Sequence, residues 1–203
     1  MKPDILEFWR KAQLFHMNPG GANDFPEGWD VREELREIFG SRHVSDIVCG
    51  YGRLCTAFRP DHYVGYDLNP AAIETARRRY PEYRFRLMRD PFDYGVNEAA
   101  LLYTVLLHIH DVDIEAVVKQ LCNSVSFIAV AEIMLRSWRD AGAARQKSAP
   151  SVFNRDVAEY VAMFAKHGFE VDDVAIAPYK RYPDTSMTFL VLGRAQPMEE
   201  GGQ

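Results

Sequence analysis

Hydrophobic residues recur along the chain in two alternating patterns, one typical of amphipathic helices and one of buried strands. Residues 4–15 carry apolar side chains at helical spacing, and Asp30 is placed to cap a second helix that ends at Gly40. Short apolar runs follow and predict strands at 43–48, 63–67, 83–88, 99–104 and 125–132.

Helices are predicted between most of these strands. Asn69 provides an N-cap and Pro70 a first helical position for a segment that ends in three arginines, which suit the negative end of the helix dipole. Residues 113–122 have a helical pattern, and Asn154 is expected to cap a further helix that stops at Gly168. Strands at 169–176 and 186–192 have no helix between them, so we expect them to pair as an antiparallel hairpin.

Strands that alternate with helices predict an α/β fold, with a mainly parallel, doubly wound sheet covered on both faces. We expect a single domain over residues 1–203. Its expected parts are a helical cap or lid at 1–40, the sheet at 41–194 and a disordered tail at 195–203.

Composition narrows the classes of function. The chain has 203 residues and a formal net charge of −5, which argues against a nucleic-acid binder that needs a basic face. Its longest nearly apolar run, 99–107, is far shorter than a membrane span, and its N-terminal sequence has no signal-peptide cleavage tail. Cys49, Cys55 and Cys122 form neither a disulfide framework nor a metal-ligand spacing. We therefore expect a cytoplasmic enzyme or binding domain without a metal site.

A glycine-containing loop follows the strand predicted at 43–48. Gly50 and Gly52 let the backbone turn sharply and approach a ligand, although a tight turn without a ligand gives the same pattern. Asp67 ends the next strand, where a carboxylate can accept both hydroxyls of a ribose. Cys55 stands where a dinucleotide fingerprint has its third glycine. The combination favours a nucleoside ligand without a pyrophosphate.

Four segments in order resemble successive motifs of the class I S-adenosylmethionine-dependent methyltransferases, namely DIVCGYGRL, GYDLNPAAI, RDPFD and LLYTVLLHI. The resemblance covers residues 44–193. It implies a Rossmann-like seven-stranded sheet in the order 3-2-1-4-5-7-6, with strand seven antiparallel. It also implies S-adenosyl-L-methionine as the cofactor and S-adenosyl-L-homocysteine as the product.

The resemblance further implies a cofactor contact for each position that matches a motif. Asp46 and the loop Cys49–Gly52 would surround the methionine part of the cofactor, and the backbone of Tyr103 and Thr104 would contact its amine. Asp67 would hold the ribose. Leu68 would pack on the adenine, and Asp90 would accept a hydrogen bond from the adenine amino group. One position departs from the family pattern, because Val48 stands where the loop usually begins with glycine. Its stiff, β-branched side chain raises the alternative of weakened or excluded cofactor, while the other motifs favour binding.

Three titratable residues lie at or just beyond the ends of the strands at 99–104 and 125–132, on the rim where an acceptor is expected. An imidazole titrates in the range that suits a general base, so His110 and His108 are candidates. His108 matches a histidine often found here in the family, and packing against backbone is its alternative role. Glu132 is a candidate base or ligand for a substrate amine, and a solvated strand end is the alternative.

The leading hypothesis is metal-independent transfer of a methyl group to oxygen or nitrogen of a small molecule. The basic segment from Arg136 to Lys147 suits an anionic acceptor, although such a run is often a solvated loop face. The main alternative is a non-catalytic cofactor-binding or scaffold subunit, and a nucleotide-dependent oxidoreductase is a weaker one because of Cys55. The sequence contains neither the motifs of nucleic-acid methylases nor the carboxylate pattern of catechol-type metal sites. A monomer or a homodimer is expected.

Overall fold

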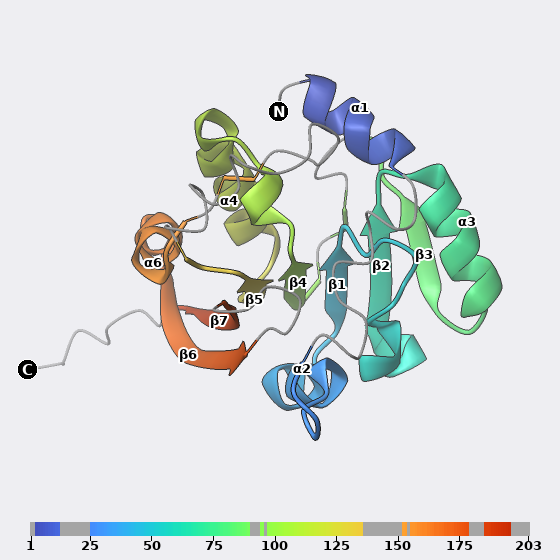
Figure 1. The fold of residues 1–203 in the computed structure, drawn as a ribbon, viewed down its shortest axis with the longest axis horizontal. Coiled ribbons are helices and arrows are strands. Elements are labelled where there is room, and N and C mark those ends of the chain that lie inside the picture. The colour runs from blue at the N-terminus through green and yellow to red at the C-terminus, as the bar shows by residue number, and fades with distance from the viewer. Residues whose placement is uncertain are drawn as a thin grey trace, which may run out of the picture.

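The computed structural model describes residues 3–12, 25–89, 94–95, 97–135, 152–153, 155–178 and 185–195. In these ranges, seven strands form one sheet in the order β3-β2-β1-β4-β5-β7-β6 (Figure 1). The strands are β1 (Val44–Ile47), β2 (Tyr63–Asp67), β3 (Arg84–Leu87), β4 (Ala99–Tyr103), β5 (Phe127–Glu132), β6 (Phe169–Pro178) and β7 (Ser186–Arg194). The pairs from β3 to β5 are parallel, and β7 runs antiparallel to both β5 and β6. The predicted strand order and the antiparallel hairpin are confirmed.

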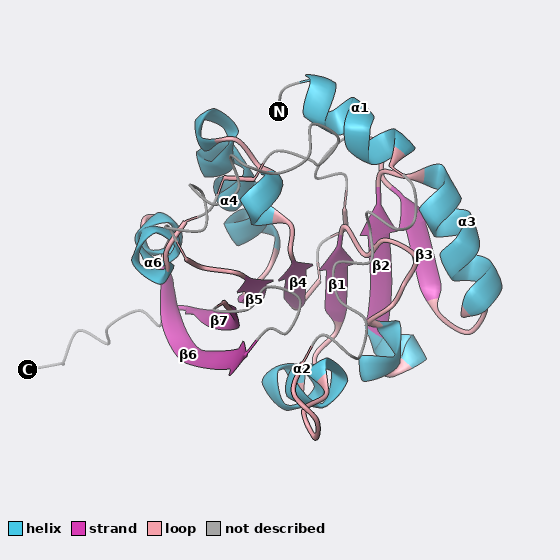
Figure 2. Cartoon of the chain, in the orientation of Figure 1, coloured by secondary structure: helices cyan, strands magenta, loops and turns pink. Residues whose placement is uncertain are grey.

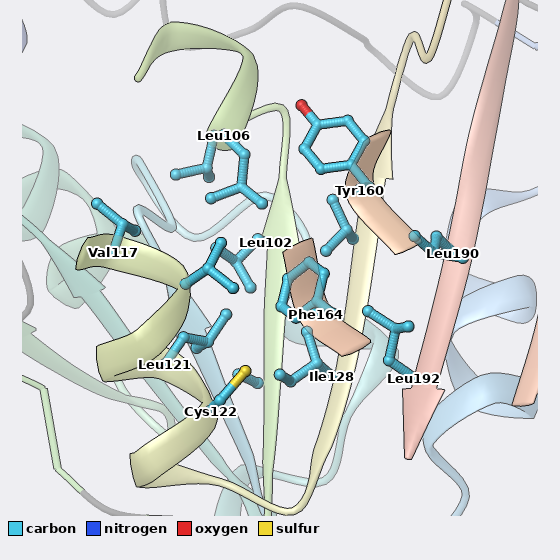
Figure 3. Close-up of a cluster of buried hydrophobic side chains, with 14 of the residues drawn as sticks. Leu102, Leu106, Val117, Leu121, Cys122, Ile128, Tyr160, Phe164, Leu190 and Leu192 are labelled. Atoms are coloured by element: carbon cyan, nitrogen blue, oxygen red, sulfur yellow. The ribbon is translucent and has the colours of Figure 1, made fainter. Parts of the chain in front are cut away.

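Helices cover both faces of the sheet (Figure 2). They are α1 (Pro3–Lys11), α2 (Val31–Phe39), α3 (Pro70–Arg79), α4 (Asp111–Ser124) and α6 (Val157–Ala165). Successive strand residues point to opposite faces, and the buried clusters divide accordingly. α2 and α3 pack on the face that carries Val44 and Tyr63, whereas α4 and α6 pack on the face that carries Leu102 and Ile128. Figure 3 shows this second cluster, in which aliphatic side chains from the sheet meet Phe164 and Tyr160 of α6.

The helix starts follow from their capping residues. Asp30 accepts from the backbone N–H of Arg32 at the start of α2, and Asn69 caps α3, as predicted. The cap predicted at Asn154 is wrong, because α6 begins at Val157 and its N-cap is Asp156. Asp156 and Glu159 form a reciprocal capping box that satisfies two backbone donors, which explains why the helix starts there.

The crossover from β1 to β2 contains only two short 3-10 helices, η2 (Cys55–Ala57) and η3 (Pro60–His62). Pro60 lacks a backbone N–H and sits only a few residues after the glycine loop, so a longer α-helix is blocked there. The glycine loop therefore leads into a single tight turn. It has no long helix whose dipole would face a ligand.

The first helix, α1, lies across the edge of the sheet at which the parallel strands end (Figure 1). Its backbone and side chains contact Asn69, Arg89 and His108, which follow β2, β3 and β4 respectively. Residues 13–24 of the cap or lid predicted at 1–40 lie outside the described residues, and so does the predicted tail after Ala195. Within the described part of the chain, every helix is too short or too polar to cross a membrane.

Candidate functional site

Backbone strain is concentrated where β1 and β4 end. Among the described residues, Val48 and Thr104 are the non-glycine residues with positive φ, at 64° and 58°. Both are β-branched, and this conformation costs such residues about 1–3 kcal/mol each. Gly50 and Gly52, two and four residues after Val48, also have positive φ. Strain of this kind gathers at ligand sites, so the carboxyl edge of β1 and β4 is the candidate site.

Asp67 joins β2 to the glycine loop. Its carboxylate is buried and accepts from the backbone N–H of Gly50 on one oxygen and of Asn69 on the other, both at 2.8 Å. Burial raises the pKa of Asp67 to about 6, against the opposing effect of these N–H donors. A carboxylate has about four acceptor positions, so its hydrogen bonds to backbone N–H groups leave some acceptor capacity. The ribose contact expected of Asp67 stays a prediction.

Asp46 lies beneath the loop. It is buried in β1 and accepts a 2.7 Å hydrogen bond from the hydroxyl of Tyr63 on β2. Burial raises the pKa of Asp46 to about 6, opposed first by this hydrogen bond and then by the charge of Arg53. Arg53 itself stacks over the ring of Tyr103, with its Cζ atom 4.6 Å from the ring centroid. The first acid of the motif thus anchors β1 to β2 below the loop, and Arg53 places a positive charge beside it.

Packing explains two of the glycines. A Cβ atom on Gly52 would lie 2.7 Å from Cζ of Phe85, so no other residue fits there without moving that ring. A Cβ on Gly65, in the middle of β2, would lie 2.8 Å from Sγ of Cys49. The Cys49 thiol is buried, and its burial raises its pKa well above the usual value. Gly65 was not identified from the sequence, although a glycine inside a strand is a known signal of close packing.

The side chains of Val48 and Leu68 pack into the core at this edge of the sheet. Val48 is partly buried and contacts the clusters on the α4 face, including the group formed by Val64, Tyr66 and Met88. Leu68, the residue expected to pack on adenine, is buried in the same group. The valine therefore directs apolar surface toward the core, which is compatible with a ligand above the loop.

The two candidate histidines lie on the segment after β4, as predicted. His110 is the N-cap of α4, and its Nδ1 accepts from the backbone N–H of Val112 at 3.2 Å. Its ring lies 4.7 Å from that of Phe153. His108 is half-buried, with its ring centroid 4.8 Å from the ring of Trp9 on α1. Both imidazoles thus have structural contacts at the rim, and in neutral His110 the accepting Nδ1 places the ring proton on Nε2.

Glu132 is fully buried at the end of β5, so its interpretation as a solvated strand end is wrong. Oε1 accepts from the backbone N–H groups of Val105 and Leu107, and Oε2 accepts from the hydroxyl of Tyr160 at 2.6 Å. Burial raises the pKa of Glu132 to about 7, opposed first by the Tyr160 hydrogen bond. The carboxylate faces protein donors and shapes the segment that carries both histidines.

Arg155 holds the other side of that segment and was not singled out from the sequence. Its guanidinium is buried and donates to the carbonyl oxygens of Leu106 and Ile109, at 3.1 and 2.8 Å, and to a carboxylate oxygen of Asp111 at 2.6 Å. An arginine between two helix-capping candidates gives no signal of burial in a single sequence, because arginine is usually exposed.

Asp90 and the basic segment from Arg136 to Lys147 lie outside the described residues. Among the residues that are described, no three His, Cys, Asp or Glu side chains gather in a way that could hold a metal ion.

The chain is similar to known proteins in structure. No protein-family model and no curated protein sequence matches it. Magnesium protoporphyrin IX methyltransferase from Synechocystis PCC 6803, solved with bound S-adenosylmethionine, aligns over 95% of this chain and 96% of its own, with a TM-score of 0.67 and 12% identity. The cyclase SpnF aligns over 94% and 95%, with a TM-score of 0.65 and 12% identity. The mitomycin 7-O-methyltransferase MmcR aligns over 81% of this chain and 53% of its own, with a TM-score of 0.61 and 17% identity. At these identities the likeness shows the fold.

Proposed function

Because the chain has the fold of the class I S-adenosylmethionine-dependent methyltransferases, we propose that it binds S-adenosyl-L-methionine and transfers its methyl group to oxygen or nitrogen of a small molecule, without a metal. The observation that carries this proposal is Asp67. It is a buried carboxylate at the carboxyl end of β2, tied to the Gly50 amide and with acceptor capacity left for a diol. Neighbouring structures with this fold hold S-adenosylmethionine or S-adenosylhomocysteine.

The proposed cofactor contacts follow the carboxyl ends of β1, β2, β3 and β4. They are Asp46 and 48–52 around the methionine part, Asp67 on the ribose, Leu68 and Asp90 on the adenine, and the backbone of Tyr103 and Thr104 on the methionine amine. The positive φ of Thr104 and its hydroxyl bond to the Tyr103 carbonyl, 2.7 Å long, give this last turn a defined shape. A rigid shape lowers the entropic cost of binding.

The bound cofactor supplies an electrophilic methyl group on a sulfonium, whose positive charge is lost as the methyl group moves. The protein then has to hold the acceptor in line with that methyl group and exclude water, which can be worth several kcal/mol. His110 is the proposed general base for an acceptor hydroxyl or ammonium. Its Nδ1 is the unprotonated nitrogen and accepts the cap bond from the Val112 N–H, so Nδ1 has to leave the cap to take the substrate proton. Glu132 and Arg155 act as positioning residues for the His110 segment.

The acceptor is proposed to be small, because the fold uses most of the chain for the sheet and its helices, which leaves α1 and a few loops to select a substrate. An anionic acceptor would suit the basic sequence between Arg136 and Lys147. A cytoplasmic location is consistent with the three cysteines, which are free and buried.

The test is methyl transfer from labelled S-adenosyl-L-methionine to a panel of small phenols, amines and carboxylates, with S-adenosyl-L-homocysteine formation as the readout. His110→Ala removes both the base and the α4 cap, whereas His110→Asn keeps a good cap and removes only the base. We expect both variants to lose roughly one-hundred-fold or more in kcat, the usual size of a general-base contribution, with little change in cofactor affinity. Normal turnover in His110→Asn would move the base elsewhere, and no transfer to any acceptor would count against an enzyme.

A second candidate is a cofactor-binding protein that does not transfer methyl groups. Val48 in the loop favours it, and so does the matching cyclase SpnF, whose described reaction is not a methyl transfer. Val48→Gly discriminates between the candidates. A large gain in affinity for S-adenosyl-L-methionine would indicate a degenerated site, and unchanged affinity would favour an intact one.

A further inference from the structure

The side chain of Asn69 connects α1 to the proposed ribose site. Its Oδ1 accepts from the backbone N–H groups of Ala71 and Ala72 and thereby caps α3. Its Nδ2 donates to the carbonyl oxygens of Trp9 and Ala12, at 3.1 and 2.9 Å, where α1 ends. Asn69 is buried, and each polar atom of its amide has a partner in the protein. One half of this side chain therefore serves α3, and the other half serves only α1.

The backbone of Asn69 extends the same connection to the glycine loop. Its N–H donates to Oδ1 of Asp67, and Oδ2 of Asp67 accepts from the N–H of Gly50. A continuous series of hydrogen bonds thus runs from the end of α1 through Asn69 and Asp67 to the loop. A ligand held by Asp67 is thus two residues along the chain from Asn69, the group that fixes α1.

Two further contacts fix α1 across the edge of the sheet. Arg10 donates to the carbonyl oxygen of Arg89, after β3, and Trp9 packs on His108, after β4. α1 therefore spans from the side of α3 to the acceptor rim (Figure 1). Among the α1 side chains that the structure describes, those of residues 7–11, none is buried. The described contacts of α1 are thus polar and ring contacts at the surface, of the kind that open at a small cost in free energy.

We propose that α1 is the wall that retains the cofactor and that Asn69 is the positioning residue that holds this wall beside Asp67. This inference rests on the proposed function, because it takes S-adenosyl-L-methionine as the ligand of Asp67. The cofactor enters and leaves when α1 detaches, and α1 closes over it when Nδ2 of Asn69 binds the carbonyl oxygens of Trp9 and Ala12. The Trp9 side chain then covers the gap between the ribose carboxylate and His108.

Asn69→Ser tests the hydrogen bonds to α1 separately from the cap of α3. Serine is an N-cap as good as asparagine, so α3 and the backbone bond to Asp67 are kept, but the two donors to α1 are lost. Asn69→Asp is the second variant, because it also keeps the cap and sets a carboxylate oxygen against the two α1 carbonyls. Asp30→Ser is the matched control, since it makes the same kind of replacement at the cap of α2, whose side-chain bond is to Arg32.

The experiment measures the dissociation rate of S-adenosyl-L-homocysteine by stopped flow and tryptic cleavage after Lys11 by mass spectrometry. Loss of two hydrogen bonds predicts roughly ten-fold faster dissociation in Asn69→Ser and Asn69→Asp, with Asp30→Ser unchanged. The ligand should protect Lys11 in the parent protein and not in the two Asn69 variants, while Tm changes little.

Tighter binding or unchanged dissociation in both Asn69 variants would overturn the inference, as would cleavage after Lys11 that the ligand does not affect in the parent. These results leave the proposed function intact, because the parent still binds. A folded parent that binds neither S-adenosyl-L-methionine nor S-adenosyl-L-homocysteine overturns the proposed function, and this inference with it.

Discussion

Val48 occupies a backbone conformation that glycine adopts without strain, so glycine and alanine at this position should reverse their usual order of stability. Its φ is 64°, and its side chain is partly buried against two core clusters. Val48→Ala and Val48→Gly both remove the packed isopropyl group. The difference between the two variants therefore isolates the backbone contribution.

The magnitude follows from two opposing effects. A left-handed conformation costs an L-residue about 1–2 kcal/mol, which glycine does not pay. The opposing effect is that a glycine makes the protein about 0.4–1 kcal/mol less stable than an alanine does, because the unfolded chain with glycine has more conformations. The difference between these two effects predicts that Val48→Gly is more stable than Val48→Ala by about 0.5–1 kcal/mol. For a chain of this length this difference corresponds to a Tm about 1–4 °C higher.

Urea unfolding of the two variants, followed by circular dichroism, measures the difference directly. Ala71→Gly in the exposed first turn of α3 is the control, because there glycine should destabilise by up to about 1 kcal/mol in the usual direction. The reasoning is refuted if Val48→Gly is less stable than Val48→Ala by the same margin as this control. Residue 48 would then lack a left-handed conformation, and the strain assigned to the site would be absent.

Two residues carry the remaining predictions. Burial raises the pKa of Glu132 from 4.5 in the unfolded chain to about 7 in the folded protein. Between these two pH values the folded protein therefore binds more protons than the unfolded chain. The contribution of Glu132 to stability is present below pH 4.5 and is lost as the pH rises through 7. Glu132→Gln should therefore remove a decline of roughly 3 kcal/mol between pH 4.5 and 7, measured by urea unfolding at each pH, and an unchanged pH profile would contradict this. Arg155→Leu leaves two buried carbonyl groups without their donor and should destabilise by roughly 2–6 kcal/mol, because each unsatisfied buried acceptor costs about 1–3 kcal/mol. The exposed carboxylate of Asp111 adds little, and a loss below about 1 kcal/mol would show that the network is dispensable.

The fold could be predicted from the sequence because its signals are local and repeated. β2 and α3 have the predicted bounds, since Asp67, Asn69 and Pro70 mark a strand end, a cap and a first helical position within four residues. The start of α6 was missed because Asn154 and Asp156 are both good caps, and only the capping box with Glu159 decides between them.

The candidate site was predictable only in part. The loop, Asp67 and both histidines follow strand ends, so the parallel sheet brings them to one edge. The burial of Glu132 depends on Tyr160, and the bonds of Arg155 depend on carbonyl groups more than forty residues away. The link from Asn69 to α1 joins residues 57 and 60 positions apart. Such contacts depend on tertiary packing, and no spacing in the sequence encodes them.

The central claim is that Asp67 and the glycine loop bind S-adenosyl-L-methionine, and isothermal titration of the cofactor into the parent protein and Asp67→Ala tests it most directly. Hydrogen bonds to a charged group are worth about 1.5–3 kcal/mol, so the variant should bind roughly ten- to one-hundred-fold more weakly while its circular dichroism stays that of a folded protein. Saturable binding to the parent with this loss in the variant is the predicted result. No binding to the folded parent, or equal binding by both proteins, would contradict the account.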